Sequence, residues 1–139
     1  MAADEDPAKV LRAALAGVPG SVSAYLFGSA AHGRMHRESD VDVGVLLDRG
    51  LFPTTAERFE ARLRLSAHLD AAVKRPVDLV VLNDAPPSLA RHIMCDGMRL
   101  LVSDPAQDHR QRCVILSRAA DLAPFLRRTR AVKLRAISR

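Results

Sequence analysis

Two aspartates that alternate with valine carry the clearest chemical signal in the chain. Asp40 and Asp42 flank Val41, and mostly apolar residues follow them, as in a β-strand. Because side chains i and i+2 of a strand point to the same face, the two carboxylates are expected to lie side by side, about 7 Å apart along the strand. Two ionised carboxylates this close raise each other's pKa unless a cation lies between them. The pair therefore predicts a site for a hard divalent cation such as Mg²⁺, which prefers oxygen ligands.

A turn of small residues precedes this pair. Residues 21–27 have the composition of an interior strand, and Gly28 and Ser29 end it. A glycine permits close approach of the backbone, and a short helix beginning at Ser29 would direct free N–H groups toward an anion. A phosphate-binding turn beside a metal-binding pair predicts chemistry on a nucleoside triphosphate, and the sequence does not indicate which nucleotide.

A third aspartate interrupts another apolar strand, expected over residues 76–82. Apolar side chains alternate on both faces of this strand, and Asp78 lies among them on one face. An ionised carboxylate on an apolar surface is costly without a partner. Two kinds of partner stay open: the cations of the site formed by the first two aspartates, or an ion pair with Lys74 or Arg75.

Two sequence blocks resemble a known superfamily. Gly28-Ser29, ten intervening residues and then Asp40-Val41-Asp42 resemble the signature of the nucleotidyltransferases that include DNA polymerase beta. The second block runs from Val77 through Asn83-Asp84-Ala85-Pro86-Pro87 to a glycine-led strand. It is similar to the smallest members, the minimal nucleotidyltransferases (MNT antitoxins of prokaryotic toxin–antitoxin pairs). The resemblance covers about residues 22–102.

The resemblance implies an α/β (α+β) fold of the polymerase beta type, with a mixed four-stranded sheet flanked by helices. It implies that Asp40 and Asp42 hold two Mg²⁺ ions, and that Asp78 binds the catalytic ion and takes the proton of the attacking hydroxyl. Gly28 and Ser29 would hold the outgoing phosphates of the ATP substrate. The catalytic and metal-binding set is therefore the three aspartates.

The same resemblance implies a Mg²⁺-dependent nucleotidyltransferase that moves AMP from ATP to a hydroxyl. The acceptor would be a tyrosine of a cognate HEPN ribonuclease toxin, so the protein would be the antitoxin of a type VII pair. Two alternatives stay open: a non-catalytic antitoxin that neutralises its partner by binding, and a small-molecule nucleotidyltransferase. The second normally needs an added substrate-binding domain, which the residues after Val102 hardly supply. His32 stands where the family often has arginine, so the electrostatics of the phosphate turn are open.

Length and composition predict one globular domain over residues 1–139. The start is acidic and polar rather than like a signal peptide, and no apolar run approaches the ~20 residues of a membrane span. Cys95 and Cys113 lack the spacing of a metal or redox site, which favours reduced thiols. These features together lead us to expect a cytoplasmic protein with no membrane partner.

Basic residues are concentrated at the C-terminal end. The net charge is +5, and residues 110–139 contain nine Lys and Arg with Asp121 as their one acid. Residues 104–139 are therefore predicted to form a basic helical segment, which Pro124 should kink or end. It could be a solvated helix or a docking surface for an acidic partner. The scarcity of aromatic residues disfavours nucleic acid, and apolar helix faces allow a homodimer without requiring one.

The helical pattern of residues 55–73 predicts the longest helix before this segment. Its apolar residues are assigned to one broad stripe facing the core. That stripe comprises Phe59, Leu63, Leu65, Leu69, Ala72 and Val73. The opposite side, with Arg58, Arg62 and Arg64, is assigned to solvent rather than to a triphosphate. Further helices are expected over residues 7–16 and 87–96, and further strands over 40–47 and 98–102.

Overall fold

The computed structural model describes residues 6–28 and 40–137, with side chains described as far as residue 122. Its elements follow in the order α1 (Pro7–Ala16), β1 (Ser21–Phe27), β2 (Val41–Leu47), α2 (Thr55–Val73), β3 (Val77–Val81), α3 (Pro87–Asp96), β4 (Met98–Val102) and α4 (Pro105–Ile137). The four strands form one sheet in the order β3-β2-β1-β4. β1 is antiparallel to β2 and β4, whereas β2 is parallel to β3. The predicted mixed four-stranded sheet is confirmed.

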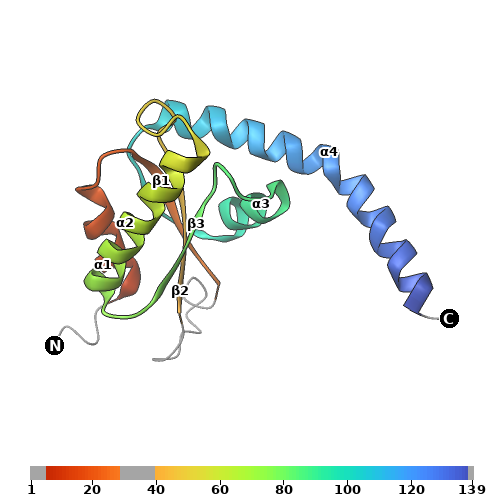
Figure 1. The fold of residues 1–139 in the computed structure, drawn as a ribbon, viewed down its shortest axis with the longest axis horizontal. Coiled ribbons are helices and arrows are strands. Elements are labelled where there is room, and N and C mark those ends of the chain that lie inside the picture. Colours follow the sequence, from red (N-terminus) through yellow and green to blue (C-terminus); the bar gives the residue numbers. More distant parts are fainter. Residues whose placement is uncertain (1–5, 29–39, 138–139) are drawn as a thin grey trace.

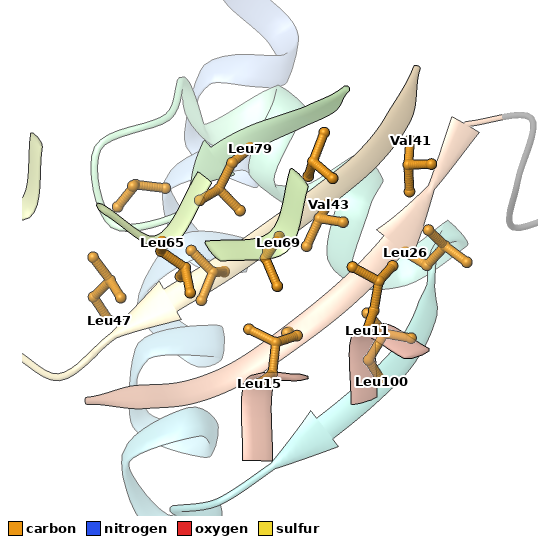
Figure 2. Packing of buried hydrophobic residues seen from close by; sticks show 14 of the residues in the cluster. Leu11, Leu15, Leu26, Val41, Val43, Leu47, Leu65, Leu69, Leu79 and Leu100 are labelled. Carbon is orange, nitrogen blue, oxygen red and sulfur yellow. The ribbon is translucent and has the colours of Figure 1, made fainter. Parts of the chain in front are cut away.

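The sheet is covered on both faces (Figure 1). α1 and α2 pack on one face, where Leu11, Leu15, Leu65 and Leu69 meet apolar side chains of all four strands (Figure 2). α3 and the first half of α4 pack on the other face, around Tyr25 and other buried residues. This coverage explains why β1, a central strand, is apolar on both faces.

α2 differs from its predicted orientation. Phe59 and Leu63 are each 53% exposed, whereas Arg58 is only 6% exposed. Residues separated by three or four positions share a helix face, so Arg58 lies on the same side as Ala61 and Leu65, which are buried. The broad apolar stripe is therefore wrong in part: α2 buries one narrow face and leaves two large apolar side chains outside.

α4 does not end at Pro124, because its backbone is helical as far as Ile137. Figure 1 shows the helix leaving the body of the domain and changing direction along its length. Proline removes one i→i−4 hydrogen bond and is a usual cause of such a bend. In the described part of the chain, no helix combines the length and apolar character needed to cross a bilayer.

Hydrogen bonds close one end of the sheet, where β2 finishes. Asn83, in the turn after β3, accepts from the Leu47 N–H at 2.8 Å and donates to the Leu47 carbonyl at 3.0 Å. Its amide also donates to Gln111 of α4 at 3.2 Å. Asp48 accepts from the N–H of Gly50 at 2.7 Å and from the Gln107 amide at 3.2 Å. Side chains of Asn83 and Asp48 thus satisfy backbone groups at this end of the sheet, and we call it the closed end.

Candidate active site

The register between β2 and β3 brings the predicted carboxylates together at the other end of the sheet. In this parallel pair Asp42 lies directly opposite Asp78. Asp40 immediately precedes β2, which begins at Val41 rather than at Asp40 itself. Asp40 and Asp78 are exposed and Asp42 is half-buried, so all three side chains are open to a ligand from solvent. We call this the carboxylate end.

Asp42 is the electrostatic centre of the group. Its pKa is raised above the ordinary value of 3.8, first by partial burial, then by the charge of Asp78, and then by the charge of Asp40. All three causes disfavour the ionised form. A bound cation would reverse the two charge effects, because it favours the ionised carboxylates that it contacts. Among the described residues, the surroundings of Asp42 thus disfavour its ionised form, and a bound cation would favour it.

Gly28 ends β1 directly against this group. Its neighbour Phe27 is paired with Asp42 across the β1–β2 ladder. Gly28 has φ +73°, a left-handed conformation that side chains rarely adopt, and a Cβ atom there would collide with Asp42 Oδ2. The backbone conformation therefore favours glycine, and any larger residue would also displace the carboxylate of Asp42. Ser29, the other predicted phosphate-binding residue, lies outside the described residues, as does His32.

The donor set is chemically suited to a hard divalent cation. Three carboxylates supply the oxygen ligands that Mg²⁺ takes in proteins. Within residues 6–28 and 40–137, no three His, Cys, Asp or Glu side chains are already clustered tightly enough to hold a metal ion. Carboxylates that repel one another are expected to stay apart until a cation draws them together. The three carboxylates are therefore chemically suited to a divalent cation, and their final arrangement depends on the binding of that cation.

A groove opens beside Asp78, along the outer edge of β3. Its volume is about 310 Å³. Its lining comprises Thr55, Phe59 and Arg62 of α2, residues 78–81 of β3, and Asp84, Ala85, Pro86 and Leu89 at the start of α3. No pattern in the sequence led us to predict this groove. The one residue that could have indicated the groove is Phe59. Ala61, Leu65 and Leu69 define the core-facing side of α2, and Phe59 does not lie on that side.

An ion pair between the buried Arg58 and the exposed Asp84 fixes one wall of the groove. Arg58 donates from Nε to Asp84 Oδ2 at 2.8 Å and from NH2 to Asp84 Oδ1 at 2.9 Å. It also donates to the carbonyl of Phe52 at 3.0 Å. The carboxylate of Asp84 accordingly raises the pKa of Arg58 above its ordinary value. The assignment of Arg58 to solvent is wrong, because this pairing satisfies the guanidinium and links α2 to the β3–α3 turn.

Comparison with known proteins places the chain in a family. The family described as "Polymerase beta, Nucleotidyltransferase" matches residues 11–106. A protein adenylyltransferase named MntA, from Shewanella oneidensis, is 33% identical over 92 residues, which are 66% of this chain and 62% of that protein. The matched region thus spans less than two thirds of that relative's length.

Solved structures show the same fold. A toxin–antitoxin complex with AMP-PNP matches with a TM-score of 0.67 at 23% identity, over 95% of this chain and 98% of the other. A complex of tri-AMPylated Shewanella oneidensis HEPN toxin with MNT antitoxin matches with a TM-score of 0.59 at 21% identity, over 96% and 97%. The structural neighbours include MNT antitoxins of HEPN toxin pairs. The chain belongs to the polymerase beta nucleotidyltransferase family.

Proposed function

We propose that this protein is a Mg²⁺-dependent nucleotidyltransferase that moves AMP from ATP to a tyrosine hydroxyl of a HEPN ribonuclease toxin, and so acts as a type VII antitoxin. One observation carries the proposal: the β2–β3 register gathers Asp40, Asp42 and Asp78 at one end of the sheet, with Gly28 against Asp42. Three convergent carboxylates are what a nucleotidyl transfer site needs.

Each carboxylate has a separate task in this account. Asp40 and Asp42 would hold the divalent cations, and Asp78 would also bind the catalytic ion. When bound, a pair of such ions stabilises the attacking and leaving oxygens of an in-line displacement. The backbone at Gly28, together with Ser29, holds the outgoing phosphates through N–H groups.

The transfer is a single in-line displacement at the α-phosphorus of ATP. The acceptor oxygen forms a bond to the α-phosphorus of ATP while the bond from that phosphorus to the α,β-bridging oxygen breaks, and pyrophosphate leaves. Asp78 accepts the hydroxyl proton, directly or through water, because its exposed carboxylate lies at the edge of the site where an acceptor can enter. The raised pKa of Asp42 means that acid weakens cation binding by protonating a ligand.

The partner is inferred from the relatives. The MntA protein is named a protein adenylyltransferase, and the solved complexes pair MNT antitoxins with HEPN toxins. The basic C-terminal segment of the chain is consistent with a docking element, since residues 110–139 carry nine cations and one acid. AMP-PNP in one of those complexes favours ATP as the nucleotide.

The test is transfer of label from α-³²P-ATP to a HEPN protein encoded in the neighbouring reading frame, with and without Mg²⁺. We expect Mg²⁺-dependent labelling by the wild type and none by Asp42→Asn. Asp48→Asn is the matched control, because Asp48 lies at the closed end of the same strand. If Asp42→Asn still protects cells from the toxin while no AMP is transferred, the protein acts by occlusion and the enzymatic proposal is wrong.

A further inference from the structure

β3 is an edge strand whose outward backbone groups are partly free. Two hydrogen bonds mark where it joins β2: Val41 N–H donates to the Pro76 carbonyl at 3.0 Å, and Leu82 N–H donates to the Val45 carbonyl at 2.8 Å. Backbone groups alternate in direction along a strand, so the even-numbered residues between Pro76 and Leu82 also face β2. The odd-numbered residues of β3 therefore face away from the sheet.

Most of those outward groups already have partners. Val77 N–H donates to Asp70 Oδ1 at 2.7 Å, and the Val77 carbonyl accepts from Ser66 Oγ at 3.5 Å. The Val81 carbonyl accepts from Asp84 N–H at 3.2 Å. Among the described residues, three outward groups remain without a hydrogen bond: the N–H and carbonyl of Leu79 and the N–H of Val81.

The groove beside Asp78 lies over these free groups. Both Leu79 and Val81 line it, with α2 on one side and the start of α3 on the other. Unpaired backbone groups away from bulk water are costly, and an exposed strand edge is a template for another strand. The groove also has large apolar walls, since Phe59 is 53% and Leu89 is 37% exposed.

We propose that an extended segment of the acceptor protein adds to β3 in this groove as a fifth, antiparallel strand and presents its hydroxyl residue opposite Asp78. This inference rests on the proposed function and specifies how that site takes its acceptor. Strand addition supplies affinity through main-chain bonds and specificity through alternate side chains. Asp78 belongs both to the groove and to the carboxylate end, so a segment bound here necessarily touches the reaction site.

Sheet geometry determines which residue of the segment pairs with the β3 backbone and which one presents the acceptor hydroxyl. When the segment runs antiparallel to β3, the residue paired with Leu79 uses its own N–H and carbonyl on β3, and its side chain faces α2, as that of Leu79 does. The adjacent residue lies opposite Asp78 with its side chain on the same face as the carboxylate, at a Cβ separation of about 5 Å. The acceptor residue is therefore next to the one that pairs with Leu79, and its own amide points away from β3.

The charges in the groove favour particular side chains in the bound segment. Arg58 neutralises Asp84, and Asp78 faces the cation site. Arg62 stacks over the Phe59 ring at 5.7 Å and has no ion-pair partner in the described part of the chain. A residue paired with Leu79 projects toward this cation, so an acidic side chain is favoured there.

The first test uses α-³²P-ATP, MgCl₂ and a library of tyrosine-centred peptides in extended form, with the full-length protein. Phe59→Glu should lower kcat/KM for the best peptide about tenfold, through KM, with ATP affinity unchanged. Leu63→Glu is the matched control, equally exposed on the same helix and outside the groove, and should change kcat/KM by less than about twofold. Arg62→Glu should reverse the preference for an acidic residue at the peptide position that pairs with Leu79.

The second test is an N-methyl scan of that peptide. Methylation of one amide adjacent to the acceptor tyrosine should abolish labelling, whereas methylation of the tyrosine's own amide should leave it within about twofold. Three outcomes would overturn strand addition. Methylation could have equal effects at both amides, Phe59→Glu and Leu63→Glu could lower kcat/KM equally, or no peptide could be labelled. A loss of ATP affinity in Phe59→Glu would assign the groove to the nucleotide instead.

These outcomes are separable from a failure of the proposed function. Mg²⁺-dependent ATP binding that is lost in Asp42→Asn supports the carboxylate site whether or not any peptide is labelled. Absence of that binding in the wild type would reject the nucleotidyltransferase proposal itself.

Discussion

The two ends of β2 each carry an aspartate, and the two residues respond to opposite surroundings. At the carboxylate end the pKa of Asp42 is raised, by partial burial and by the charges of Asp78 and Asp40. At the closed end the pKa of Asp48 is lowered, chiefly by hydrogen bonds from Gln107 and from the Gly50 N–H. At the closed end the chain's own hydrogen bonds stabilise the ionised form of Asp48, whereas at the carboxylate end burial and neighbouring charges disfavour the ionised form of Asp42.

This difference separates polar residues that hold the fold from those that bind something else. Asn83 and Asp48 satisfy backbone groups of their own chain, so their loss should destabilise the protein. Asp42 repels its neighbours, so its loss should remove activity and relieve the fold. Perturbed carboxylates without an internal partner are a physical reason to suspect a functional site. Four predictions test the contrast, in order of expected size.

The largest effect is expected on catalysis at the carboxylate end. Asp42→Asn removes one charged cation ligand, which is worth several kcal/mol in a metal-assisted displacement, so AMP transfer should fall about 10³-fold. Asp48→Asn should leave the rate within about twofold. The measurement is label transfer from α-³²P-ATP under saturating Mg²⁺. Equal losses in both variants would mean that the two ends do not differ as described.

The next effect is on stability at the closed end. Asn83→Ala removes both bonds to the Leu47 backbone and the bond to Gln111, at a cost of about 2 kcal/mol in the free energy of unfolding. The activity of the folded fraction should be unchanged. Asn83→Asp keeps the acceptor for the Leu47 N–H and loses the donors, so it should fall between Ala and the wild type. Urea unfolding checks this order, and an unchanged midpoint for Asn83→Ala would contradict it.

A smaller effect is expected from adding one methyl group. Gly28→Ala places Cβ against Asp42 and strains a left-handed backbone, for a cost of about 1–2 kcal/mol together with weaker Mg²⁺ affinity. Gly17→Ala is the control, because nothing lies within 4 Å of its Cβ position and its φ is −91°. That variant should be neutral within about 0.5 kcal/mol. Thermal unfolding with and without Mg²⁺ distinguishes strain alone from damage to the cation site.

The smallest expected effect is a gain in stability rather than a loss. In metal-free protein, Asp42→Asn should raise the free energy of unfolding by up to about 1 kcal/mol, after allowance for solvent screening. The folded state binds the Asp42 proton more tightly than the unfolded chain does. The destabilisation is therefore full above the raised folded-state pKa, and is relieved as pH falls from that value to about 3.8. A variant less stable than the wild type without Mg²⁺ at neutral pH would contradict this.

Local patterns were enough to predict most of the fold. Patterns of neighbouring residues predicted the positions of β1, α1, α3 and β4, because such patterns depend on local sequence alone. The meeting of Asp42 and Asp78 followed from the family resemblance rather than from spacing. A register between two strands is set by packing of residues far apart in sequence, which local patterns do not encode.

What the sequence did not predict depends on three-dimensional pairing. Arg58 has the composition of a solvent-facing residue, and only the position of Asp84 after β3 makes its burial favourable. Once Arg58 takes a core-side position, Phe59 and Leu63 turn outward and form part of a surface. The groove along β3 is lined by three separate segments, so the exposed position of Phe59 in α2 was not enough to predict it.

The most direct test of the central claim is the pKa of the Asp42 carboxyl group, measured by NMR titration of its side-chain carbon with and without Mg²⁺. The account predicts a value above 3.8 in metal-free protein, and a decrease when Mg²⁺ binds among the three carboxylates. A value at or below 3.8 that Mg²⁺ leaves unchanged would contradict it.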